Sequence, residues 1–142
     1  MQYYALGFVF DASFEHVLLM HKSKPEWQAG KVNGLGGKVE AGENSIACMV
    51  REIQEEADLA TKEGEWVPAG EMRGVDWVVN VYGLVYKGAM NDARSLEEER
   101  VEWFAVGALP AASIANLVWI VPFVKNMLLK NDGANPFLVE YT

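Results

Sequence analysis

Three glutamates in the short stretch REIQEE could hold a metal ion together. On a helix, residues three and four apart are neighbours, so Glu52, Glu55 and Glu56 would share about a third of the circumference, away from the apolar side. Like charges at this spacing cost a few tenths of a kcal/mol per pair, so helix stability does not explain why the three glutamates are there. Mg²⁺ prefers oxygen ligands and commonly bridges carboxylates to a substrate phosphate. The spacing suits a divalent-cation site, but the three glutamates taken alone are better explained as a solvated acidic face, helped by the pair of Arg51 with Glu55.

The segment GLGGKVEAGE, which starts at Gly34, precedes these glutamates. Glycines allow the backbone to approach a ligand closely. Lys38 can meet phosphate charge as part of the same segment. This neighbourhood favours the metal site over the solvated face.

A helix is needed to present the glutamates, and the sequence predicts one over Asn44–Ala57. Its apolar stripe is Ile46, Met49, Val50, Ile53 and Ala57, and Asn44 is a good N-cap. A second helix is expected over Leu117–Lys130, with Pro122 near its first turn or at a kink. Strands are expected over residues 2–10, 16–22, 66–74, 75–88, 100–106 and 135–141, with loops over 23–37 and 89–99. This order predicts an α/β (α+β) fold in which helices pack against the sheet.

Composition limits the classes of protein that remain. A chain of 142 residues with 51% hydrophobic residues suits a single domain spanning 1–142. A net charge of −8 disfavours binding to long nucleic acid. The apolar runs are short and the first residues do not resemble a secretory signal, so we expect a cytoplasmic protein without a membrane partner. The single cysteine, Cys48, excludes an internal disulfide and is expected to be a small buried side chain.

This region resembles the Nudix box, G-x5-E-x7-R-E-U-x-E-E-x-G-U, in which U is aliphatic. The matching positions are Gly37, Glu43, Arg51, Glu52, Ile53, Glu55, Glu56 and Leu59. Asp58 stands where the box has its last glycine, which usually ends the helix in a left-handed conformation. Aspartate tolerates that conformation better than most residues, so we expect the helix end to be kept with slight strain.

The resemblance implies an α/β/α sandwich with a mixed sheet and a Mg²⁺ cofactor, for which Mn²⁺ can substitute. By that resemblance the metal ligands are Glu52, Glu55 and Glu56, with the main-chain carbonyl of Gly36 or Gly37. Glu43 and Arg51 would brace them by a salt bridge. The proton acceptor is expected to be Glu52 or Glu56, and the second candidate is Glu98 or Glu99 from the later acidic loop.

The stretch from Trp27 to Glu43 is similar to that of the MutT-type enzymes, which sanitise oxidised purine nucleoside triphosphates. The resemblance implies that Asn33 reads the base edge and Trp27 contacts the base; both could instead be ordinary loop residues. Asn116 and Trp119 could line the pocket, although Trp119 is expected to be a core residue. The paired aspartates of animal relatives have no counterpart between Ser113 and Val124.

The sequence therefore predicts Mg²⁺-dependent hydrolysis of a nucleoside triphosphate, with oxidised purines as one candidate class, to a monophosphate and pyrophosphate. One alternative is hydrolysis of another nucleoside diphosphate conjugate, such as ADP-ribose or a dinucleoside polyphosphate. Another is a nucleotide-binding module without turnover, against which the intact glutamates argue. The expected partner is a small nucleotide, and the protein is expected to be a monomer or homodimer.

Overall fold

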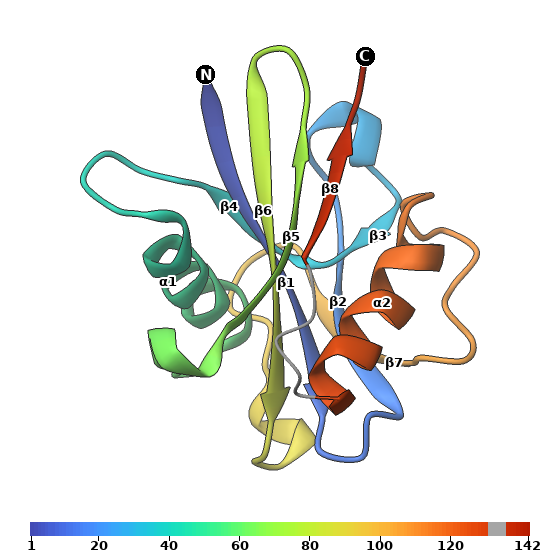
Figure 1. Cartoon of the computed structure of the whole chain (residues 1–142). Coiled ribbons are helices and arrows are strands. Elements are labelled where there is room, and N and C mark those ends of the chain that lie inside the picture. Colours follow the sequence, from blue (N-terminus) through green and yellow to red (C-terminus); the bar gives the residue numbers. More distant parts are fainter. Residues whose placement is uncertain (131–135) are drawn as a thin grey trace.

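The computed structural model describes residues 1–130 and 136–142, which form a mixed sheet with a helix on each face (Figure 1). The strand order is β3-β2-β1-β6-β5-β8, while β4 also pairs with β1 and β7 with β2. The bounds are β1 Gln2–Asp11, β2 His16–His21, β3 Val32–Asn33, β4 Leu35–Lys38, α1 Ser45–Ala57, β5 Val67–Arg73, β6 Trp77–Tyr86, β7 Val101–Ala105, α2 Leu117–Lys130 and β8 Phe137–Glu140. Three short 3-10 helices are η1 Glu26–Gln28, η2 Glu63–Glu65 and η3 Met90–Asp92. The predicted α/β class is confirmed.

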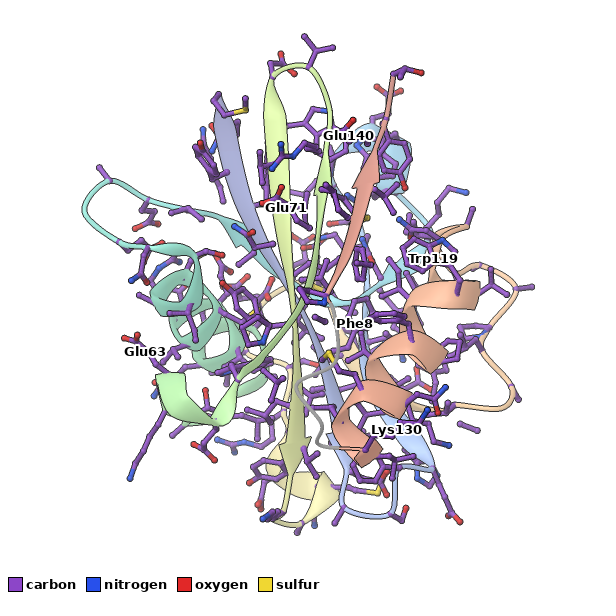
Figure 2. All side chains as sticks on the ribbon, viewed as in Figure 1. Phe8, Glu63, Glu71, Trp119, Lys130 and Glu140 are labelled. Carbon is purple, nitrogen blue, oxygen red and sulfur yellow. The ribbon has the colours of Figure 1, made fainter. Side chains whose placement is uncertain are left out.

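The centre of the sheet is the parallel pair β1 and β6, which stay in register from Gln2 opposite Trp77 to Asp11 opposite Tyr86. The neighbours β2 and β5 pair antiparallel to them. The sheet is therefore mixed, and each face has its own core. Cys48, Met49 and Ile53 of α1 pack on one face. The buried residues of α2 pack on the other, against Phe8 (Figure 2).

Both ends of α1 were predicted correctly. The Asn44 side chain accepts a hydrogen bond from the Ala47 N–H at 2.9 Å, which caps an otherwise unsatisfied donor of the first turn. Asp58 ends the helix with φ 60° and ψ 30°, in the left-handed region that a glycine would normally occupy. The helix end is kept, as expected, although the box glycine is missing.

The predicted loop over residues 23–37 is partly wrong, because β3 and the start of β4 lie within it. In β4, Gly36 pairs with Leu6 and Gly37 with Ala5. A Cβ on Gly36, whose φ is +152°, would lie 1.9 Å from the Ala5 carbonyl oxygen. Glycine composition suggested a loop, but here glycine allows two strands to approach closely.

The helix over Leu117–Lys130 has the predicted bounds, and Pro122 lies inside it. The last predicted strand began at Asn135, which lies outside the described residues; the observed strand begins at Phe137. Within residues 1–130 and 136–142, no helix has the length and apolar character needed to cross a membrane.

Replacing Gly36 by alanine should destabilise the protein, because the new Cβ would meet the Ala5 carbonyl and the backbone conformation disfavours a side chain. We expect the free energy of unfolding to fall by about 2 to 4 kcal/mol. Urea denaturation measures this change. Gly64→Ala is the matched control, since nothing lies within 4 Å of its added Cβ. Equal urea midpoints for Gly36→Ala and Gly64→Ala would contradict the close contact between Gly36 and the Ala5 carbonyl.

Candidate active site

Glu52, Glu55 and Glu56 form the acidic face of α1, and this face lies against the glycines of β4. A Cβ on Gly37 would lie 2.5 Å from Oε1 of Glu52, so any other residue at this position would push that carboxylate out of its place. Next to it, the Gly36 N–H donates a hydrogen bond to Oε1 of Glu56 at 3.0 Å. The absent side chain of Gly37 therefore leaves space for Glu52, and the backbone of Gly36 binds Glu56.

Arg51 connects the carboxylates of this face. Its guanidinium forms a bidentate pair with Glu43, at 3.1 Å from Nε and 2.7 Å from Nη2. Its Nη1 donates to Glu52 at 3.0 Å and to Glu55 at 3.2 Å. The hydrogen bonds from Arg51 to Glu43 lower the pKa of Glu43 to about 2, so Glu43 stays ionised. The predicted salt bridge between Glu43 and Arg51 is present.

Glu56 is buried, with 4% of its surface exposed, whereas Glu55 is exposed. The expectation that all three glutamates face away from the core is thus wrong for Glu56, because β4 covers this side of the helix. Burial raises the pKa of Glu56 to about 8, and the nearby charge of Glu52 acts in the same direction. Burial also raises the pKa of Glu52, against the opposing effect of Arg51.

The carboxylate oxygens of Glu52, Glu55 and Glu56 are the kind of ligand that a hard divalent cation prefers, but these side chains do not converge on a single position. Across the described part of the chain, no three His, Cys, Asp or Glu side chains converge in a way that could hold a metal ion. Glu52 and Glu55 are instead turned to Arg51, and Glu56 to the Gly36 N–H. The space that a Cβ on Gly37 would fill, and the two partly desolvated carboxylates beside it, suit an oxygen-ligated ion. A metal site would require Glu55 to turn away from Arg51.

The predicted carbonyl ligand was that of Gly36 or Gly37, and Cys48 lies next to the second of these. The Cys48 thiol lies 3.6 Å from the Gly37 carbonyl oxygen, which it approaches as a donor. Burial raises the pKa of that thiol to about 12, so it stays protonated and unreactive. The thiol also lies 3.5 Å from the Lys38 carbonyl oxygen, to which it can donate instead, so Gly36 and Gly37 both stay candidates for the carbonyl ligand.

Glu98 and Glu99, the candidate acids of the loop before β7, have different surroundings. Glu99 is buried and accepts hydrogen bonds from the Ser23 N–H at 2.6 Å and the Lys24 N–H at 3.2 Å. Its carboxylate is taken up by these hydrogen bonds, which anchor the loop to the segment after β2, and this argues against its predicted role as a base. Glu98 is exposed, and its role stays a prediction.

Two residues near the carboxylates were not singled out by the sequence. After burial, the charge of Glu97 adds to the raised pKa of both Glu52 and Glu56. The Lys22 charge lowers the pKa of Glu56, and its Nζ lies 3.3 Å from Glu99. Glu97 belongs to the acidic run already noted, but nothing in the sequence indicated that Lys22 would come close.

The predicted substrate residues of the first half lie on η1, β3 and β4. Trp27 is 63% exposed on η1. Asn33 donates to Oε1 of Gln28 at 3.1 Å and accepts from the Gly34 N–H at 2.8 Å, so its amide is held in place. Lys38 ends β4 beside the acidic face, where its carbonyl accepts from Arg51.

The other two predicted substrate residues lie at the start of α2. Asn116 donates to Sδ of Met72 at 3.5 Å. Trp119 is 36% exposed and packs edge-on against Phe137 at 5.1 Å, so its expected place in the core is wrong (Figure 2). Hydrogen bonds between Val32 and the segment before α2 bring β3, and with it Asn33, next to this helix end.

Comparison with known proteins identifies the family. A family model described as the NUDIX domain matches residues 2–122, which confirms the resemblance of the box. The fold is similar to a MutT NUDIX hydrolase from Burkholderia pseudomallei, at 21% identity, with 87% of this chain and 97% of that chain covered and a TM-score of 0.72. It is also similar to a MutT protein from Bacillus halodurans, at 22% identity, with 100% of this chain and 91% of that chain covered and a TM-score of 0.71. A NUDIX hydrolase from Nitrosomonas europaea has a similar fold at 18% identity, with 99% of this chain and 78% of that chain covered and a TM-score of 0.73. The chain therefore belongs to the Nudix family and is a pyrophosphohydrolase.

Proposed function

We propose that this protein hydrolyses a nucleoside triphosphate in a reaction that requires Mg²⁺, releasing a nucleoside monophosphate and pyrophosphate. Mn²⁺ is expected to substitute. Oxidised purine nucleotides are the first class to test, because two of the solved structures with this fold are described as MutT proteins. The observation that carries the proposal is the placement of two glutamates against β4, with Glu52 in the space beside Gly37 and Glu56 on the Gly36 N–H.

The residues of this face have separate roles in the proposed reaction. Arg51 holds Glu52 toward β4, and the Gly36 N–H holds Glu56. Glu52, Glu55, Glu56 and the carbonyl of Gly36 or Gly37 would hold the cation, which supplies charge neutralisation at phosphate and activation of water. Glu52 or Glu56 would accept the proton of the attacking water, because each is partly withdrawn from solvent. Lys38 and Lys22 add positive charge for a phosphate chain.

The base is expected to lie between η1, β3 and the start of α2. Trp27 offers an exposed indole face for stacking. Asn33 and Asn116 each carry an amide with a donor and an acceptor, which suits the edge of a base. Trp119 lies on the same helix end as Asn116 and packs against β8, so it would border this region from outside.

The test is product analysis with purified protein, Mg²⁺ and a panel of canonical and oxidised nucleoside triphosphates, ADP-ribose and dinucleoside polyphosphates. We expect a monophosphate and pyrophosphate from one of the triphosphates. Preferred hydrolysis of ADP-ribose or a dinucleotide would replace the proposed substrate class. Nucleotide binding without any metal-dependent product would instead indicate a module without turnover.

Replacing the glutamates one at a time should abolish most of the activity. Glu52→Gln and Glu56→Gln should each lower kcat by about 10²-fold to 10⁴-fold, because each loses a ligand or proton acceptor. Glu55→Gln should also weaken Mn²⁺ binding, measured by calorimetry without substrate. Glu63→Gln is the control, since Glu63 is exposed on η2 (Figure 2). Wild-type kcat in Glu56→Gln would rule out its proposed role.

Trp27→Ala should raise KM and leave the unfolding midpoint unchanged, because this indole is 63% exposed. Loss of one stacking contact should raise KM by about 5-fold to 100-fold. Steady-state kinetics with the preferred nucleotide and with pyrophosphate-containing compounds lacking a base would measure the effect. An equal change for both substrates would show that Trp27 does not contact the base.

A further inference from the structure

The side-chain amides of Asn33 and Gln28 form a hydrogen-bonded network that starts at a backbone N–H. The Gly34 N–H donates to Oδ1 of Asn33 at 2.8 Å, and Nδ2 of Asn33 donates to Oε1 of Gln28 at 3.1 Å. A backbone N–H can only donate, so the end of the Asn33 amide beside it must be the oxygen. The NH2 group of Asn33 therefore faces Gln28, which must present its own oxygen in turn.

This orientation leaves the NH2 group of Gln28 available to a ligand. Within residues 1–130 and 136–142, Nε2 of Gln28 forms no hydrogen bond, although the side chain is half-buried. No buried side-chain nitrogen or oxygen in this part of the protein lacks a partner, so Nε2 is open to the outside. An amide NH2 group carries two donors. The open end of the network is thus a pair of N–H groups beside Asn33.

The backbone around Gln28 is also held in place. The Gln28 N–H donates to the Pro25 carbonyl at 2.9 Å, and its carbonyl accepts from the Lys31 N–H at 2.9 Å. Lys22, directly after β2, donates to the Lys31 carbonyl at 2.8 Å and accepts from the Gly30 N–H at 2.9 Å. A side chain carried by a fixed turn loses little entropy on binding, which favours a role in recognition.

We propose that Gln28 is a specificity-determining residue, whose NH2 group donates to a carbonyl oxygen of the base, so that 6-oxo purines are preferred over 6-amino purines. The inference rests on the proposed function, because it places the base at η1 and β3. A 6-amino group would bring its own donors against the Gln28 NH2 group. Turning the Gln28 amide over would relieve that conflict only by setting two NH2 groups against each other at Asn33.

Gln28→Glu separates the two ends of this side chain. The carboxylate still accepts from Nδ2 of Asn33 but has no N–H to donate, whereas Gln28→Leu loses both functions. In ligand-free protein, the NMR signal of the Asn33 side-chain amide should therefore shift in Gln28→Leu and stay close to its wild-type position in Gln28→Glu. An unchanged signal in Gln28→Leu would show that the network does not hold Asn33, and would overturn the inference.

Base preference is measured by calorimetry with inosine monophosphate and adenosine monophosphate, which differ only at the 6-position and in the proton on N1. Neither has an anhydride bond, so no turnover enters the measurement. Wild-type protein should bind inosine monophosphate about 5-fold to 100-fold more tightly, which is the discrimination expected from a well-placed donor. The ratio of affinities should fall to about 1 or below in both Gln28→Leu and Gln28→Glu.

Gln54→Glu is the matched control, because it makes the same change at an exposed position of α1 and should keep the wild-type ratio. Equal affinity of wild-type protein for the two monophosphates, or binding of neither, would overturn the inference. A wild-type ratio in Gln28→Glu would also overturn it, since Gln28 would then only support Asn33. Failure of the proposed reaction would appear in product analysis with Mg²⁺ and not in this binding ratio.

Discussion

The contact between Arg51 and its surrounding carboxylates is the interaction on which the acidic face depends. One guanidinium contacts Glu43, Glu52 and Glu55 at 2.7 to 3.2 Å and also reaches the Lys38 carbonyl. Without this positive charge, the glutamates of α1 would repel one another close to a sheet that excludes water from two of them. Arg51 therefore allows the helix to carry a group of carboxylates that its own stability disfavours.

The glycines of β4 are the second requirement, because they bring the sheet close enough to use that face. Gly36 contacts the β1 backbone, and Gly37 leaves space for Glu52. The same approach buries Glu56 and supplies its hydrogen bond from the Gly36 N–H. A carboxylate with a raised pKa and a fixed orientation is thus a consequence of strand packing and not of the helix alone.

The acidic loop shows where sequence reasoning reached its limit. The run from Leu96 to Glu99 indicated a group of candidate acids, but it could not distinguish an anchor from a ligand. Burial and four donors from Lys22, Ser23 and Lys24 make Glu99 an anchor, while Glu98 is exposed. The difference depends on Ser23 and Lys22, far away in the chain, so no local pattern could show it.

The sequence by itself determined α1 with its Asn44 cap, its left-handed end at Asp58 and the spacing of its acids, because these depend on residues within a few positions of one another. The motif was also sufficient to indicate the family. The tertiary structure alone decided that Glu56 is buried, that Trp119 lies at the surface and that Asp58 contacts Arg94. Each of these depends on which distant segments pack together, and side-chain periodicity in one segment carries no information about its partner.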